Sequence, residues 1–181
     1  MELIDVLDEF GNPTGEVETK DEIYRRGLWH RSSHIWIEND KKELLVQKRN
    51  PNKQTFPNLW ALSVAGHVDS GETSRQAAIR ELKEEVNLDV DANELEYLFT
   101  IRRIQPYKDS YIRVFDDVYL LHKNIDVEKT KLQVEELTDI KYVYYQYLED
   151  IFKGGDKDYV PYTEEHKKLF SILEDRNLEI I

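Results

Sequence analysis

The sequence predicts an α/β fold, in which helices cover a mixed β-sheet, and two observations support this class. Strand-like segments rich in β-branched and aromatic residues dominate the chain. Helix-like segments with their own capping signals are interspersed irregularly among them, rather than alternating regularly with the strands. The 181 residues, 40% of them hydrophobic, are enough to form one domain with a buried core. We therefore expect a single domain over residues 1–181.

The expected strands are extended segments bounded by turn residues. In order, they lie in residues 2–18 (two short strands around a turn at 11–13), 30–40, 43–49, 61–66, 95–104, 111–123 and 139–145. The segment between 43–49 and 61–66 contains a loop rich in Pro and Asn at 50–58. Because consecutive side chains of a strand face opposite sides, each strand contributes to both faces of the sheet.

Four helices are expected between and after these strands. Thr19 and Glu22 predict a capping box for a short first helix, and Thr73 and Gln76 predict another for a helix that begins at about Ser74. Residues that favour left-handed backbone, or that commonly follow a helix, mark the helix ends. The expected helices cover about residues 20–26, 74–86, 145–153 and 163–176, and the first three end at Gly27, Asn87 and Gly154.

Composition and charge restrict the possible partners. The net charge of −12 disfavours binding to nucleic acid or to anionic lipid, but it permits a small phosphorylated ligand held by a metal ion. The chain has no cysteine, which excludes disulfides, thiolate metal sites and cysteine nucleophiles. The acidic first residues do not read as a signal peptide, and no stretch approaches about 18 apolar residues. We expect a cytoplasmic protein that does not cross a membrane.

Three glutamates, Glu81, Glu84 and Glu85, lie close together on the helix expected at 74–86. Their spacing of three and four residues places them on one arc of the helix, where like charges destabilise it by a few tenths of a kcal/mol per pair. The apolar stripe expected to pack on the sheet consists of Ala78, Ile79, Leu82 and Val86. The acidic arc is either a solvated helix face or a cation site. Oxygen ligands without cysteine suit Mg²⁺ or Mn²⁺, with water and substrate phosphates as the other ligands.

A longer pattern surrounds these glutamates. Residues 66–88 follow G-x5-E-x7-R-E-U-x-E-E-x-G-U, where U is aliphatic, except that Asn87 stands where the pattern has Gly. This pattern resembles the signature of the Nudix hydrolases. Since Asn tolerates left-handed backbone, we expect the helix end to be kept. Residues 44–49, 56–67 and 132–143 are similar to segments that flank the signature in this family, so the resemblance covers about residues 30–145.

The resemblance implies a Nudix-type α/β/α sandwich with a central mixed sheet. Residues 1–29 would form an N-terminal extension that contains strands, residues 30–145 the core, and residues 146–181 the C-terminal helices. It also implies an enzyme that cleaves the diphosphate linkage of a nucleoside diphosphate derivative, or of a related organic pyrophosphate, by attack of water on phosphorus. The C-terminal helix would close the pocket or form a homodimer.

The resemblance also assigns site residues. The expected metal ligands for Mg²⁺, or for Mn²⁺, are the carbonyl of Gly66 and the carboxylates of Glu81, Glu84 and Glu85. Glu81 or Glu85 would also deprotonate the attacking water, which a bound metal makes more acidic. A further acid often completes such a site. The favoured candidates are Glu135 and Glu136, and the alternatives are Asp116 and Asp117.

Other residues near the pattern have two interpretations each. Lys48, Arg49 and Lys53 either bind phosphates or form a basic surface patch. Glu72 and Arg80 are expected to brace the loop and helix through an ion pair. The alternative is a plain surface pair. Trp60 is expected to be a core residue rather than a platform for base stacking.

Within the superfamily, the chain looks most like the branch that includes isopentenyl-diphosphate isomerase. The extension before His30, the strand that follows it and the sequence Ala65-Gly66-His67 carry this resemblance. The isomerase uses a Cys directly before the Gly-His pair, and here Ala65 has no proton to transfer. We therefore expect isomerase chemistry to be absent, with His30 and His67 in structural roles or in contact with substrate. A domain that binds a nucleotide without catalysis is the other alternative, and the intact set of acids argues against it.

Overall fold

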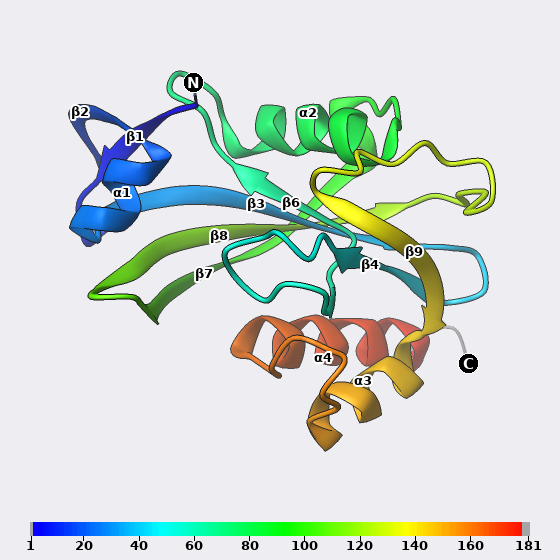
Figure 1. The fold of residues 1–181 in the computed structure, drawn as a ribbon. Helices are drawn as coiled ribbons and strands as arrows, with labels where there is room; N and C mark the ends of the chain where they lie inside the picture. Colours follow the sequence, from blue (N-terminus) through cyan, green and yellow to red (C-terminus); the bar gives the residue numbers. More distant parts are fainter. Residues whose placement is uncertain (1, 179–181) are drawn as a thin grey trace.

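The computed structural model describes residues 2–178 and contains a nine-stranded mixed sheet between two helical layers (Figure 1). The strands are β1 (Leu3–Leu7), β2 (Pro13–Thr19), β3 (Trp29–Glu38), β4 (Glu43–Arg49), β5 (Trp60–Ala61), β6 (Val64–His67), β7 (Leu95–Tyr107), β8 (Ser110–His122) and β9 (Leu137–Tyr144). The helices are α1 (Lys20–Arg26), α2 (Ser74–Val86), the 3-10 helix η1 (Ala92–Glu94), α3 (Tyr145–Gly154) and α4 (Glu164–Leu178). Helix α2 covers one face of the sheet and α3 and α4 cover the other (Figure 1), as the predicted sandwich requires.

Strand β3 is the centre of the sheet. It pairs in parallel with β8 over its whole length, from Trp29 to Glu38, and antiparallel with the short strand β6. It pairs with β4 at only one position, where Glu38 lies opposite Leu44. From that position the two strands diverge, and β4 pairs with β9 and β5 instead. Between the first half of β3 and the last half of β4, the sheet is continued by β6, which pairs with β3, and by β5, which pairs with β4.

Alternation along β3 divides its side chains between two hydrophobic cores. Ile35 and Ile37 are fully buried in the core that contains Leu82 of α2. Trp36, between them in sequence, is fully buried in the core that contains Phe170 of α4. Burying a side chain of this size stabilises the fold by about 1.5–3 kcal/mol, so both helical layers are held by the same strand.

The single strand predicted at 61–66 is two strands with different partners. β5 pairs with β4, whereas β6 pairs with β3. The buried Ser63 lies between them, where its Oγ donates to the carbonyl of Leu45 (2.6 Å) and accepts from the amide of Ile37 (2.8 Å). These two bonds satisfy the backbone amide of Ile37 in β3 and the carbonyl of Leu45 in β4, where the two strands diverge. They also hold the chain as it crosses from β5 to β6.

Two predicted helix-end features differ in the structure. The Thr19 side chain accepts from the amide of Glu22 (3.4 Å), but the Glu22 carboxylate binds Arg25 (2.6 Å), so only half of the predicted capping box forms. Helix α3 includes Gly154, and the left-handed residue that ends it is Gly155 at φ 68°. The prediction placed this helix end one residue too early, because either glycine of the pair meets the backbone requirement.

The ends of α2 are those that the sequence predicts. Thr73 and Gln76 form a complete capping box, and Asn87 adopts left-handed backbone at φ 50°. An Ala at position 87 lacks the side-chain amide that makes this conformation accessible to Asn. We expect Asn87→Ala to lower the free energy of unfolding by about 1 kcal/mol and Asn87→Gly to leave it nearly unchanged. Urea denaturation of the three proteins checks this, and equal stabilities for Ala and Gly would contradict it.

The N-terminal strands and α1 form a small unit at one end of the sheet (Figure 1). The unit has its own core of Ile4, Val6 and Ile23. It also holds the loop between β6 and α2, because the Ser70 amide donates to the Leu3 carbonyl (2.7 Å). The Asp5 carboxylate accepts from the Ser70 hydroxyl (2.6 Å) and from the Gly71 amide (3.3 Å). Strand β1 is thus a support for this loop.

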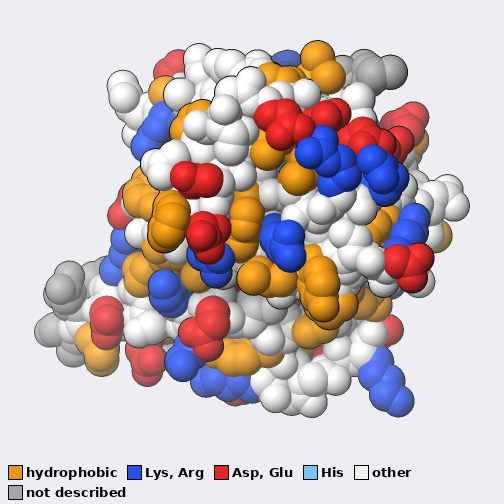
Figure 2. Space-filling model, turned by 90° about the vertical axis from the view of Figure 1, so that its left-hand side faces the viewer, with side chains coloured by type: hydrophobic (Ala, Val, Ile, Leu, Met, Phe, Trp, Pro, Cys, Tyr) orange, Lys and Arg blue, Asp and Glu red, His pale blue; other side chains and the backbone are white. Residues whose placement is uncertain are grey.

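Charges of both signs occur together at this end of the molecule. Figure 2 shows that acidic and basic side chains are interspersed over the face of the molecule that includes the N-terminal unit. Arg26 contacts Glu16 (2.7 Å) and Glu18 (2.8 Å), for example. The net negative charge therefore does not make this face uniformly acidic. None of the helices in residues 2–178 has the length and apolar character needed to cross a membrane.

Candidate active site

The three acids of α2 lie at different depths. Glu85 is 3% exposed, the Glu81 side chain is 13% exposed, and the Glu84 side chain is 47% exposed. Glu85 lies among the buried residues of α2 because its arc adjoins the apolar stripe that includes Leu82. Two carboxylates are therefore held against the sheet, and the third remains at the surface.

Gly66 of β6 provides the space that Glu81 occupies. A Cβ at position 66 would lie 2.0 Å from the carboxyl carbon of Glu81 and 2.0 Å from its Oε1. Such distances are impossible, so no side chain fits while Glu81 keeps its position. The first residue of the sequence pattern is thus required because of the acid that comes fifteen residues later.

We expect Gly66→Ala to displace the Glu81 carboxylate and to lower kcat/KM by about 10-fold to 100-fold, since small misplacements in a reacting site have effects of this size. The same substitution at Gly154, where an added Cβ would meet nothing within 4 Å, is the matched control. Steady-state assays and thermal unfolding of both variants check this. An active and stable Gly66→Ala protein would contradict the close packing.

Arg80 connects the loop with the acidic helix. It donates two hydrogen bonds to Glu72, each 3.0 Å long, and one to the carbonyl of His67 at 3.0 Å. It also contacts Glu81 (2.6 Å) and Glu84 (3.5 Å). The hydrogen bonds from Arg80 lower the pKa of Glu72. Arg80 therefore braces the loop against α2 and partly neutralises the neighbouring acids.

Glu85 lies beside residues from two other segments. Gln47 of β4 donates to its Oε2 (3.2 Å), and the amide of Gln133 donates to its backbone carbonyl (2.9 Å). The charge of Glu136 acts on it as well, and Glu136 forms an ion pair with Lys53 from the loop after β4. The loop at 50–58 and the segment before β9 thus meet at the buried end of α2.

Burial and like charges make this region unfavourable for anions. Burial is the largest influence on Glu81 and raises its pKa to about 7, although Arg80 opposes the shift. Burial also raises the pKa of Glu85 well above its ordinary value, and Glu81 and Glu136 raise it further. Carboxylates held in this way stabilise a bound cation. The donors are all oxygen, which fits Mg²⁺ or Mn²⁺.

The structure brings only some of the other candidate residues to these acids. Glu136 is near Glu85, but its neighbour Glu135 is exposed. Arg49 is near both Glu85 and Glu136, and their charges raise its pKa although burial, the largest influence, lowers it overall. Glu135 and Glu136 differ because the loop before β9 brings consecutive residues to different surroundings.

Lys48 is on the other face of the sheet from Glu85. Its Nζ lies 5.4 Å from the centroid of the Trp60 ring, which is 8% exposed in the core beneath α3 and α4. Gln47, the preceding residue, faces Glu85. Because consecutive strand residues face opposite sides, Lys48 is not brought to the acids of α2, whereas Trp60 is the core residue that was predicted.

Asp116 and Asp117 each have partners elsewhere. Asp117 pairs with Arg31 (2.8 Å) and accepts from Thr100 (2.6 Å). Asp116 is fully buried and pairs with Arg103 through two contacts of 2.7 and 3.1 Å. Neither carboxylate is therefore available to complete the site on α2.

Within residues 2–178, only His34, Asp116 and Glu165 bring three potential metal ligands within 4.8 Å of one another. Both ring nitrogens of His34 already face carboxylates, Nδ1 towards Glu165 (2.7 Å) and Nε2 towards Asp116 (3.3 Å). Glu165 also accepts from Trp36 (2.9 Å), and Asp116 accepts from Arg103. This geometry is that of an imidazolium between two carboxylates, which is an ion-pair network rather than a metal site.

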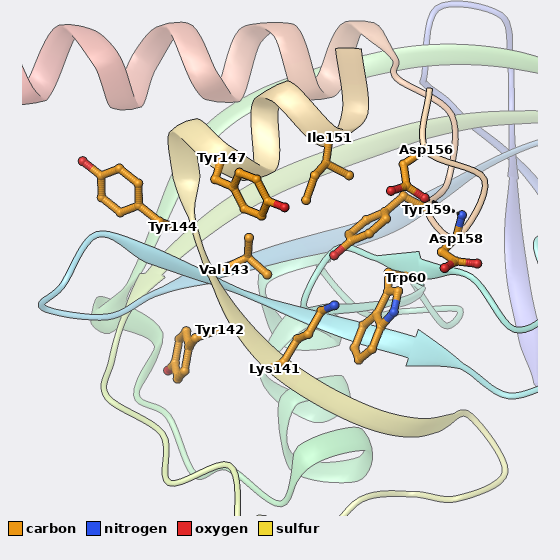
Figure 3. A pocket seen from close by; sticks show the side chains of 10 residues that line it. All are labelled: Trp60, Lys141, Tyr142, Val143, Tyr144, Tyr147, Ile151, Asp156, Asp158 and Tyr159. Carbon is orange, nitrogen blue, oxygen red and sulfur yellow. Dashed lines mark hydrogen bonds between the residues drawn. The ribbon is translucent and has the colours of Figure 1, made fainter. Parts of the chain in front are cut away.

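A groove of about 460 Å³ lies between β9 and α3 (Figure 3). Trp60 and Tyr159 line it, and the Nζ of Lys141 lies 4.0 Å from the Trp60 ring centroid and 5.3 Å from that of Tyr159. The groove is on the α3 side of the sheet, together with Lys48, and therefore opposite Glu85. The lysine already occupies the aromatic faces that a ligand would use.

A family model described as a NUDIX domain matches residues 28–164, which is most of the chain. The chain belongs to the Nudix family. An uncharacterized Nudix hydrolase of Listeria innocua is 35% identical to it over 162 residues, covering 90% of each protein. Nudix hydrolase 3 of Arabidopsis thaliana is 36% identical over 97% of this chain, but the chain spans only 24% of that protein.

Solved structures agree with the fold of this Nudix hydrolase. The crystal structure of the Deinococcus radiodurans protein DR0079 superimposes with a TM-score of 0.72, at 22% identity, over 96% of this chain and 98% of that one. Isopentenyl-diphosphate isomerase of Corynebacterium diphtheriae is 34% identical over half of each chain, in accord with the expected branch. Ala65 of this chain lies opposite His34 in the β3–β6 ladder, and its methyl group has no acid–base chemistry.

Three residues near the site were not foreseen from the sequence: Gln47, Tyr24 and Glu2. The sequence contained a signal for Gln47, because this residue shares a face of β4 with Leu45, which belongs to the core beneath α2. A polar side chain on that face must find a buried hydrogen-bond partner. Tyr24 and Glu2 had none. Both reach His67 from the N-terminal unit, and that contact depends on how α1 and β1 pack.

Proposed function

We propose that this Nudix hydrolase cleaves the diphosphate linkage of a nucleoside diphosphate derivative, or of a related organic pyrophosphate, with Mg²⁺ as its cofactor. The observation that carries the proposal is the burial of Glu81 against Gly66 and of Glu85 beside Gln47, with both pKa values raised above the ordinary range. Acids buried together reduce the stability of the fold unless a cation neutralises them. A role in stabilising the metal-free protein therefore does not account for these two acids.

In this proposal the metal ligands are the Gly66 carbonyl and the carboxylates of Glu81, Glu84 and Glu85, with Glu136 as the further acid. Bound Mg²⁺ supplies neutralisation of the phosphate charge and a more acidic water. Glu136 is preferred over Glu135 because its charge acts on Glu85. Mn²⁺ has the same preference for oxygen ligands and would serve as a substitute.

The positive groups beside these acids would bind the diphosphate. Arg49 is half-buried within electrostatic range of Glu85 and Glu136, and its Nε and Nη2 donate to Thr55 (3.0 and 3.2 Å). The remaining N–H groups of its guanidinium would donate to a phosphate. Lys53 pairs with Glu136 and would contact a phosphate from the loop. Either Glu81 or Glu85 takes the proton of the attacking water, because both have raised pKa values and both adjoin the proposed metal position.

A panel of diphosphates tests the proposal. The panel contains ADP-ribose, UDP-glucose, diadenosine diphosphate, isopentenyl diphosphate and geranyl diphosphate, each with Mg²⁺ or with a chelator. We expect Mg²⁺-dependent release of phosphate-containing products from at least one compound, with label from isotopic water on a product phosphate. Isomerisation of isopentenyl diphosphate without hydrolysis, or turnover of none of the compounds, would contradict the proposal.

A further inference from the structure

Gln47 of β4 is a polar side chain in apolar surroundings, and it is 3% exposed. Leu45, two residues earlier on the same face of β4, belongs to the core beneath α2. Ile140, directly opposite Gln47 on β9, belongs to the same core. A buried amide lowers the stability of a fold unless it forms hydrogen bonds, whereas an apolar side chain would pack here without that penalty. The presence of an amide therefore needs an explanation from its contact.

The contact of Gln47 is with the carboxylate of Glu85. Its Nε2 donates to the Oε2 of Glu85 (3.2 Å), and within residues 2–178 no other group donates a hydrogen bond to this carboxylate. An ionised carboxylate only accepts hydrogen bonds, so the amide is the donor whenever Glu85 binds a cation. One donor occupies one of about four lone-pair positions of the two oxygens, and the others remain for a metal ion.

Both partners of this hydrogen bond are held by the backbone. Gln47 lies opposite Ala61 of β5 and opposite Ile140 of β9, so β4 is paired along both edges at this residue. Glu85 lies in α2, and its own carbonyl accepts from the amide of Gln133 (2.9 Å). A hydrogen bond between two such elements fixes the orientation of the carboxylate relative to the sheet.

Another buried acid, Asp116, has partners of a different kind. It is fully buried, accepts from Arg103 at 2.7 and 3.1 Å, and lies 3.3 Å from the Nε2 of His34. Its negative charge is therefore balanced by groups of the protein itself. The donor to Glu85, in contrast, is a neutral amide.

Two basic side chains lie within electrostatic range of Glu85, but each binds another group. Arg49 donates to Thr55, and Lys53 forms an ion pair with Glu136. The carboxylate of Glu85 is thus oriented by a direct contact that supplies no positive charge. This is the arrangement that a metal ligand requires, because a cationic partner would compete with the metal ion for the carboxylate.

We infer that Gln47 is a positioning residue of the metal site, whose neutral amide orients the Glu85 carboxylate for a divalent cation without competing for its charge. This inference rests on the proposed function, in which Glu85 is a metal ligand. Without the amide, the carboxylate can rotate away from the metal position. With a cationic side chain in its place, the carboxylate forms an ion pair instead.

The test titrates wild type, Gln47→Met and Gln47→Lys with Mg²⁺ alone and follows binding by calorimetry. Met has nearly the length of Gln but no N–H donor. We expect the dissociation constant for Mg²⁺ to rise by about 10-fold for Gln47→Met and by about 100-fold for Gln47→Lys, within the range for loss of a group that orients a metal ligand. The Mg²⁺ concentration that gives the half-maximal rate should rise by the same factors, on any panel compound that wild type cleaves.

Excess Mg²⁺ gives a readout that a merely structural role of Gln47 would not produce. In Gln47→Met the carboxylate of Glu85 is still present, so saturating Mg²⁺ should restore kcat to within about twofold of wild type. In Glu85→Gln the ligand itself is absent, and saturating Mg²⁺ should not restore kcat. A Gln47→Met protein that is less stable but keeps the Mg²⁺ affinity of wild type would show that the amide serves only the fold.

Leu45→Met is the matched control, because Leu45 lies on the same face of β4 in the same core and does not contact the carboxylate. It should bind Mg²⁺ within about twofold of wild type, since a swap of Leu for Met keeps the packed volume. Thermal unfolding without metal verifies that each variant folds, and Gln47→Leu takes the place of Gln47→Met if the latter does not.

Two results would overturn the inference while leaving the proposed function in place. One is a Gln47→Met protein whose affinity for Mg²⁺ is within about twofold of wild type, and the other is a Gln47→Lys protein that binds Mg²⁺ as tightly as Gln47→Met. If wild type neither binds Mg²⁺ nor cleaves any compound of the panel, the proposed function is overturned, and this inference with it.

Discussion

Glu85→Gln should abolish most activity while making the metal-free protein more stable. We expect kcat/KM to fall by about 1000-fold, since a buried charge that neutralises and positions reacting groups has effects of this size. The amide has the shape of the carboxylate and can keep the contact with Gln47, so the fold is preserved. It cannot carry the negative charge that a divalent cation requires from its ligands.

The opposite effect on stability follows from the raised pKa of Glu85. A carboxyl group whose pKa is higher in the folded protein contributes stability that is complete below its ordinary value of 4.5 and is lost as the pH rises through the folded value. Glu85→Gln removes this loss. At about pH 8 without metal, we expect the free energy of unfolding to increase by on the order of 1 kcal/mol.

Chemical denaturation at several pH values, with and without Mg²⁺, measures both effects. Mg²⁺ should stabilise wild type by mass action and leave Glu85→Gln unchanged. Glu94→Gln is the control, because Glu94 is an exposed acid that pairs with Lys123 at 2.8 Å. If Glu85→Gln retained both activity and the stabilisation by Mg²⁺, the buried acids of α2 would not be the metal site.

His34→Ala should lower the free energy of unfolding by about 3 kcal/mol, which is typical for removal of one partner from a buried ion pair. His34 and Arg103 balance the charges of Asp116 and Glu165. Without the imidazolium, two buried carboxylates face one guanidinium. Since Glu165 belongs to α4 and Asp116 to β8, the loss should weaken the attachment of the C-terminal helix to the sheet.

The same network predicts how stability changes with pH. Burial lowers the pKa of His34, but Glu165 and Asp116 outweigh it and raise the pKa above 6.5. Its contribution is therefore complete below 6.5 and is lost as the pH rises through the folded value. Burial raises the pKa of Asp116, whereas His34 and Arg103 lower it to about 2, so its contribution is lost between about 3.8 and 2 as the pH falls.

Denaturation from acid to alkaline pH should show wild type losing stability above neutrality and His34→Ala losing much less. Lys129→Ala is the control, since Lys129 forms an ion pair with Asp126 in which both side chains are exposed, and we expect it to leave the stability and its pH profile nearly unchanged. Equal pH profiles for wild type and His34→Ala would show that the imidazole is not charged in the folded protein.

Local features of the fold were largely predictable. Helix α2 has the predicted capping box at Thr73 and the predicted left-handed end at Asn87. Both depend on contacts within a few residues, so neighbouring sequence carries the information. The strand at 61–66 was misread as one segment, because its two halves pair with β4 and β3, and pairing partners are not recorded in a short stretch.

In the candidate site, too, local features were predictable and the features that depend on long-range contacts were not. Lys48 and Arg49 were predicted as one basic group, although a strand places neighbours on opposite faces, and the structure shows Lys48 on Trp60 and Arg49 near Glu85. The choice between Glu135 and Glu136 depended on the loop before β9. That loop is held by backbone bonds such as the one from Asn50 to the Glu136 carbonyl (2.9 Å), which no local pattern records.

The amino-acid order alone establishes the family, the acidic helix and the link between Gly66 and the glutamates, because one short continuous segment carries all of them. Folding in three dimensions settles which remote groups surround that segment. Gln47, Glu136 and Tyr24 reach it from separate elements. Their arrival depends on strand register and on packing between layers, and these arise from many long-range contacts acting together rather than from any single stretch of residues.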